Sequence, residues 1–75
     1  MQYDERKPFT PEPGKVYTNN GGGRFRCLSV VGTNEAVFEN VRSGWICKAH
    51  GIGAYPDETI DWVYSTGGHF NENRR

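Results

Sequence analysis

The amino-acid sequence predicts an all-β domain, a small five-stranded barrel of the SH3 type. No window shows a sustained helical repeat of apolar residues, and the apolar stretches are short and separated by turn residues. The segment from Ser43 to Phe70 combines two tryptophans, two tyrosines and five glycines. Large rings fill a small core, and glycines allow strands to bend. An OB-like barrel is the alternative, although residues 14–70 leave little room for its usual helix.

The chain of 75 residues has the length of one domain. Residues 1–13 contain Pro8, Pro11 and Pro13, which fix φ and remove backbone donors. They are therefore expected to form an extended or disordered arm. Residues 14–70 form the predicted barrel, and residues 71–75 a flexible tail.

Strong turn signals separate the first three predicted strands. Asn-Asn-Gly-Gly-Gly at 19–23 is typical of a hairpin, because positive φ is favourable there. Gly32-Thr33-Asn34 provides the next turn. The three strands are Lys15–Thr18, Arg24–Val31 and Glu35–Val41.

Two further strands complete the predicted sheet. Trp45–His50 follows the turn Arg42-Ser43-Gly44. A looser glycine-rich loop, Gly51–Glu58, then leads to Thr59–Tyr64, where apolar and polar residues alternate as in a strand with one buried face.

The third and fourth strands can be aligned so that one shared face is small or apolar. The expected pairs are Ala36 with Ala49, Phe38 with Cys47, and Asn40 with Trp45. In the second strand, Phe25 and Cys27 share a face, yet Leu28 and Val30 are also expected inside. A bulge near Cys27–Leu28 reconciles the two, since one extra residue switches the alternation.

The net charge is zero, which argues against a DNA-coating protein or a polybasic membrane-binding protein. The first residues lack the apolar region of a signal peptide, and no stretch approaches the length of a membrane span. A cytoplasmic location is therefore expected. Cys27 and Cys47 are then expected to be free thiols.

The chain carries four residues that could bind zinc: Cys27, Cys47, His50 and His69. No Cys-x-x-Cys occurs, and Cys47 and His50 point to opposite faces of a predicted strand. The same geometry separates a thiol nucleophile from an imidazole base, and a buried thiol is inert. We therefore expect no metal, no cofactor and no catalytic residues, and the protein is predicted not to be an enzyme.

Two other motifs favour structural roles. The acids Asp57, Glu58 and Asp61 surround a Pro-Asp turn without calcium-loop spacing, so they are interpreted as solvated turn residues. The glycines at 21–23 lack the Lys-Ser/Thr ending of a phosphate-binding loop and are interpreted as a hairpin turn.

One surface remains as a candidate ligand-binding site. If Val16 pairs with Cys27, Tyr17 faces Arg26 on the outer surface, alongside Lys15 and Arg24. Alternation also directs Lys48 and His50 outward. Such a surface suits stacking on a base or contact with an anionic partner, and its alternative interpretation is a solvated barrel face. The predicted site consists of Tyr17, Arg24, Arg26, Lys48 and His50.

A series of motifs extends over most of the chain: Gly14-x-Val16-Tyr17-x-Asn19, Phe25-x-Cys27-Leu28, Ala36-x-Phe38-x-Asn40, Ser43-Gly44-Trp45, Ala49-His50-Gly51, Tyr55-x-Asp57, Ile60-x-Trp62 and Ser65-x-x-Gly68-x-Phe70. In these motifs the chain resembles small SH3-like barrel proteins of bacteriophages, prophages and gut Firmicutes. Such proteins commonly have glycine where Glu58 stands here. The resemblance implies action by binding, as in anti-CRISPR proteins, other defence inhibitors and nucleotide-signal sponges.

The sequence therefore favours a binding module encoded by a phage. It is expected to dock on a bacterial host protein, such as a defence protein, and to inhibit it. The alternative is a nucleotide or nucleic-acid binder, including a nucleotide-signal sponge, that uses the Tyr/Arg/Lys surface. A homodimer is compatible with so small and aromatic a surface, and no membrane contact is expected.

Overall fold

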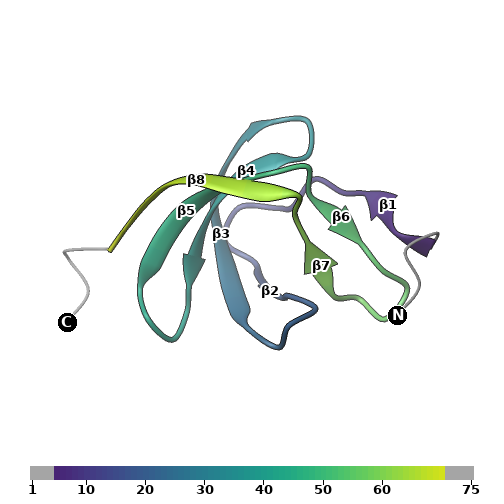
Figure 1. The fold of residues 1–75 in the computed structure, drawn as a ribbon, viewed down its shortest axis with the longest axis horizontal. Coiled ribbons are helices and arrows are strands. Elements are labelled where there is room, and N and C mark those ends of the chain that lie inside the picture. The colour runs from purple at the N-terminus through teal and green to yellow at the C-terminus, as the bar shows by residue number, and fades with distance from the viewer. Residues whose placement is uncertain (1–4, 71–75) are drawn as a thin grey trace.

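The computed structural model describes residues 5–70, which form eight strands in two antiparallel sheets (Figure 1). The predicted all-β class is confirmed, since no α-helix occurs among these residues. No helix in this range is long and apolar enough to cross a membrane. The predicted tail at 71–75 and the first four residues of the arm lie outside the described residues.

The larger sheet has five strands in the spatial order β2-β3-β4-β5-β8. Its strands are β2 (Val16–Thr18), β3 (Arg24–Gly32), β4 (Glu35–Asn40), β5 (Trp45–His50) and β8 (Tyr64–Phe70). Its first four strands lie where the turn signals predict them, and β5 has the expected bounds.

The smaller sheet consists of β1 (Lys7–Pro8), β6 (Gly53–Ala54) and β7 (Ile60–Asp61), in the order β1-β6-β7. Pro8 is on the outer strand of this sheet, where a missing backbone donor is tolerated. A bridge between Asn19 and Ile60 connects the two sheets, and the Asn20 N–H donates to the Ile60 carbonyl at 3.0 Å.

The predicted fifth strand, Thr59–Tyr64, is wrong. The chain leaves the small sheet after Asp61 and enters the large sheet at Tyr64, where β8 pairs with β5. Trp62 lies between the two strands and stacks on Phe38 in the core. The polar and glycine-rich residues of β8 have weak strand propensity, and their extended conformation depends on pairing with β5.

The register between β4 and β5 confirms the first two expected pairs, Ala36 with Ala49 and Phe38 with Cys47. The third pair, Asn40 with Trp45, does not form because Asn40 closes the turn instead. Its carbonyl accepts from the Gly44 N–H at 2.8 Å, and its side-chain oxygen accepts from the backbone N–H groups of Arg42 and Ser43.

The predicted bulge in β3 is confirmed by a register shift between Cys27 and Ser29, but its expected effect on burial is wrong. Leu28 and Val30 remain 40% and 38% exposed. The core is completed by Ile52 and Ile60, from the loop after β5 and from the small sheet.

Phe38 lies at the centre of the core and is fully buried. Trp62 stacks on it with 5.2 Å between ring centroids, and the rings of Tyr17 and Phe25 meet it edge-on at 6.3 Å. Aromatic rings from three strands of the large sheet and from the segment between the two sheets therefore share one core.

Candidate functional site

The structure separates the residues of the predicted Tyr/Arg/Lys/His surface. Tyr17 pairs with Phe25 and Val16 with Arg26, one residue away from the expected register. A slip of one residue moves a side chain to the opposite face of a sheet. Tyr17 therefore points inward, against Phe9 and Phe38, and its prediction as an outer-surface residue is wrong.

The two arginines of that predicted surface differ in their surroundings. Arg26 lies 3.8 Å from the carboxylate of Glu39, a residue that is only 4% exposed. Arg24 is exposed beside the glycine turn, opposite Thr18. Of the predicted site, Arg24 and Lys48 thus present exposed cations, whereas the charge of Arg26 faces an acid.

His50 belongs to a polar cluster that spans three strands. Its Nδ1 lies 3.0 Å from Glu35 Oε2, and its Nε2 lies 2.9 Å from Thr66 Oγ1. Tyr64 stacks on the imidazole, with 4.5 Å between centroids and 10° between ring planes. The sequence did not indicate Glu35, Tyr64 or Thr66, because two of them lie on β8, whose pairing with β5 was not predicted.

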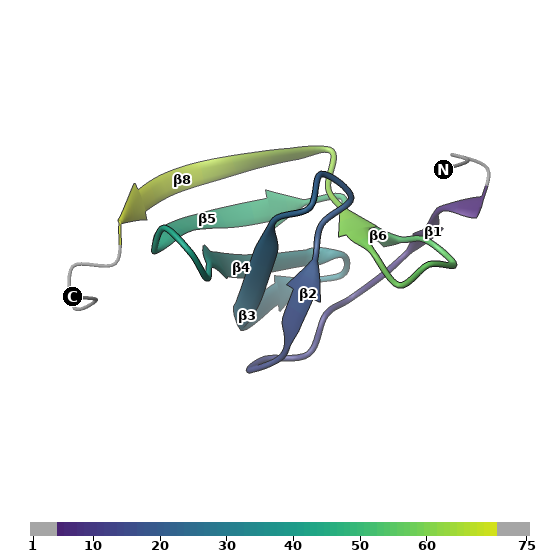
Figure 2. The ribbon, with the colours of Figure 1, turned by 90° about the horizontal axis from the view of Figure 1, so that it is seen from below.

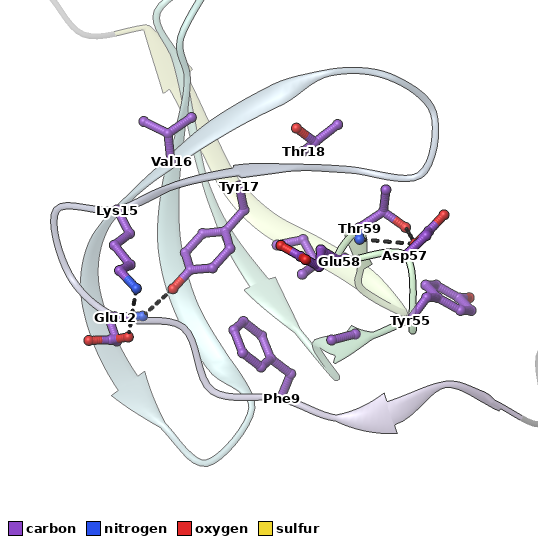
Figure 3. Close-up of a pocket in the computed structure, with 12 residues that line it drawn as sticks. Phe9, Glu12, Lys15, Val16, Tyr17, Thr18, Tyr55, Asp57, Glu58 and Thr59 are labelled. Carbon is purple, nitrogen blue, oxygen red and sulfur yellow. Dashed lines mark hydrogen bonds and ion pairs between the residues drawn. The ribbon is translucent and has the colours of Figure 1, made fainter.

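A second feature is an open groove between the N-terminal arm, the β2 strand and the turn from β6 to β7 (Figure 3). We call it the arm groove, and its volume is about 830 Å³. Its lining consists of Phe9, Glu12, Lys15, Val16, Tyr17, Thr18, Ala54, Tyr55, Asp57, Glu58, Thr59 and Ile60.

One wall of the arm groove is aromatic. The rings of Phe9 and Tyr17 meet edge to face with 5.4 Å between centroids. The Tyr17 hydroxyl accepts a hydrogen bond from the Glu12 N–H at 2.8 Å, which fixes the ring (Figure 3). The Lys15 ammonium lies 3.1 Å from the Glu12 carboxylate. The hydrogen bond to Glu12 and then its negative charge raise the pKa of Lys15, so the lysine stays cationic.

The opposite wall is acidic. Asp57 accepts hydrogen bonds from the hydroxyl and the backbone N–H of Thr59, at 2.6 and 3.0 Å. These bonds, the hydroxyl first, lower the pKa of Asp57 below its usual value, so it remains a carboxylate at neutral pH. Glu58 is exposed and adopts φ of 71°, a left-handed conformation that favours glycine.

A polar network holds the arm in place beside the groove. The Arg6 Nε donates to Asp61 Oδ1 at 2.6 Å, and the Tyr55 hydroxyl donates to Asp61 Oδ2 at 2.7 Å. Arg6 also donates to the carbonyl of Gly51. A Cβ on Gly53 would lie about 2.5 Å from the Arg6 guanidinium, so a larger residue would force the arginine to shift.

The two thiols are buried, and among the described residues the potential metal ligands do not gather at one site. Cys27 and Cys47 are free and buried, and burial raises the pKa of both thiols. Residues 5–70 contain no group of three or more His, Cys, Asp or Glu side chains placed to hold a metal ion. Among the predicted turn acids, Asp57 and Glu58 line the arm groove, whereas Asp61 is paired with Arg6.

Comparison of the chain with protein-family models, curated proteins and solved structures finds no match. The function is therefore inferred from the geometry of residues 5–70. The arm groove was missed from the sequence because the arm was interpreted apart from the barrel. The acids after Pro56 were identified, but nothing local indicated that Phe9 lines the same groove.

Proposed function

We propose that this chain is a non-enzymatic binding module built on a small SH3-like barrel. In this proposal it is encoded by a phage, acts in the bacterial cytoplasm, and docks on a host protein to inhibit it. The arm groove is the docking site. Its support is the combination of a fixed aromatic wall with an acidic wall across an open depression. A few well-placed rings and charges are typical of protein-binding surfaces.

The backbone of Glu58 is the observation that carries the proposal. An L-residue in the left-handed region costs about 1–2 kcal/mol, and glycine would occupy the position freely. The glutamate side chain is exposed at the rim of the groove, and it is not needed to fill a core. A carboxylate held in an unfavourable conformation beside a groove favours a role in contact with a partner.

The charges of the groove select the partner's chemistry. Glu12 neutralises Lys15, so the net charge of the lining residues is negative and comes from Asp57 and Glu58. Cationic side chains are attracted both to carboxylates and to the faces of aromatic rings. The partner is therefore a protein with an exposed Lys- or Arg-containing segment that lies between the two walls.

The test is capture from a bacterial lysate followed by titration of the isolated partner. Immobilised wild type should retain a protein that Glu58→Gly and Asp57→Asn retain at least tenfold less well. Glu5→Gln removes an exposed acid outside the groove lining and should bind as the wild type does. Glu58→Gly should also unfold at a higher urea concentration, which separates lost binding from lost folding. Equal retention by all four proteins would refute the groove as the docking site.

The alternative function, nucleotide or nucleic-acid binding, has one supporting observation. Tyr64 is 56% exposed and stacks on His50, and Lys48 lies on the same face of β5. An exposed ring beside a cation suits a nucleobase and its phosphate. In this alternative the base stacks on Tyr64 and not, as the sequence suggested, on Tyr17. Arg24 and Arg26 lie nearer the other edge of the sheet. A melting shift with cyclic nucleotides, or salt-dependent retention on single-stranded DNA, would favour this alternative.

A further inference from the structure

The β8 strand forms a long, open edge of the large sheet. It is last in the strand order and pairs with β5 on one side, and no described strand pairs with its other side. Figure 2 shows β8 lying along β5 at one side of the molecule. All seven of its residues, Tyr64 to Phe70, are exposed. Its outer edge is therefore open to another strand, and the Gly67 carbonyl lies 3.1 Å from Nδ1 of His69.

Apart from one β-bulge, this edge lacks the features that usually prevent pairing between molecules. Natural edge strands carry lysine or proline, or they are very short. The segment from Tyr64 to Phe70 contains no Lys, Arg, Asp, Glu or Pro. By contrast, β2 at the other edge of the sheet has only three residues and follows Lys15. The one irregularity in β8 is a register shift at Gly67, whose φ is 65°.

Apolar side chains accompany the open edge at both ends. Val63 is 72% exposed and lies just before β8, and Phe70 is 60% exposed at its end. Phe70 contacts Trp45, itself partly exposed, with 4.8 Å between ring centroids. Rings exposed next to unpaired backbone groups are typical of a surface that is covered in an assembly.

We infer that a second copy of this chain pairs with β8, edge to edge and antiparallel. The strand carries no formal charge and the whole chain has a net charge of zero, so two copies do not repel each other. A two-fold axis makes the same patch serve both partners. This inference is independent of the arm groove, which is lined by β2 at the opposite edge of the large sheet.

The faces of β8 determine the register. Thr66 and His69 lie opposite Lys48 and Ile46 on the outer face, whereas Ser65 and Phe70 lie opposite Ala49 and Trp45 on the inner face. Paired residues must share a face. Outer-face residues pair with outer-face residues, and inner-face with inner-face, when Thr66 of one copy lies opposite His69 of the other and Ser65 lies opposite Phe70. The register shifts at Gly67 of the two copies then lie next to each other at the two-fold axis, where the glycines have no side chains.

Sedimentation equilibrium of the wild type over 1–500 µM tests the association. We expect a reversible dimer. His69→Lys places two cations beside the axis and should weaken the dimer at least tenfold, whereas Thr18→Lys, on the opposite edge strand, should leave it unchanged. A wild type that stays monomeric at 500 µM would overturn the inference, as would a dimer that Thr18→Lys disrupts and His69→Lys does not.

A covalent test examines the register and does not depend on a destabilised variant. Thr66→Cys combined with His69→Cys should give a dimer joined by disulfides when oxidised glutathione is added, because facing Cβ atoms lie within disulfide range. The matched control, Thr66→Cys with Phe70→Cys, puts the thiols on opposite faces and should crosslink at least tenfold less. Equal crosslinking of both variants would contradict the register. Retention of a different protein by β8 from a monomeric wild type would show that the edge takes a foreign strand.

Discussion

Replacing Asp61 by asparagine should release the N-terminal arm and lower the free energy of unfolding by about 2–4 kcal/mol. The carboxylate accepts from Arg6 at 2.6 Å and from Tyr55 at 2.7 Å, and the Arg6 and Asp61 side chains are only 22% and 16% exposed. A hydrogen bond to a charged group contributes about 1.5–3 kcal/mol, and a neutral one about 1 kcal/mol. The loss is large, because a domain of 75 residues has a total stability of about 4–11 kcal/mol.

A double-mutant cycle with urea unfolding, followed by tryptophan fluorescence, measures the interaction itself. We expect Arg6→Gln and Asp61→Asn to show a coupling energy of about 1–2 kcal/mol, as residues in one network do. Tyr55→Phe removes only the second donor and should cost about 1 kcal/mol. Additive effects of Arg6→Gln and Asp61→Asn, within about 0.3 kcal/mol, would refute the role assigned to the pair.

Three further outcomes are expected. Phe38→Ala should lower the free energy of unfolding by about 3–5 kcal/mol, and Phe38→Leu by clearly less, since the fully buried ring is the centre of the core; equal losses in urea unfolding would contradict this. Gly53→Ala should displace the Arg6 guanidinium and speed hydrogen exchange at the Phe9 amide, whose partner is the Ile52 carbonyl; unchanged exchange would contradict it. The buried thiols have a raised pKa in the folded state, so their contribution to stability should be constant below about pH 8.5 and fall as the pH rises from there through the folded values. The same fall in urea unfolding for a variant with both cysteines changed to alanine would show another cause.

The sequence predicted those parts of the fold that local chemistry determines. Turn residues at 19–23, 32–34 and 42–44 predicted the first four strands of the large sheet, and the apolar pattern predicted the pairing of Phe38 with Cys47. The alternation over Thr59–Tyr64 was interpreted as one strand, although its two halves pair with different sheets. No local signal indicates such a change of partner.

The candidate site was less accessible to prediction, because it depends on contacts between distant segments. A one-residue error in the pairing of β2 with β3 placed Tyr17 on the wrong face. The arm groove requires Phe9 beside Tyr17 and the acids beyond Pro56, which only the folded chain brings together. The positive φ of Glu58 also appears only in the folded chain, since a glutamate gives no local signal of that conformation.

The shared core has a consequence for biosynthesis. Phe9 leaves the ribosome early, but the segment around Ile52 that binds its backbone, and Asp61, which anchors Arg6, are translated much later. Contacts between such distant segments form slowly, because a long loop must close first. The arm therefore docks only after nearly the whole domain has been synthesised, and a nascent chain stopped before Asp61 should still expose it to proteases.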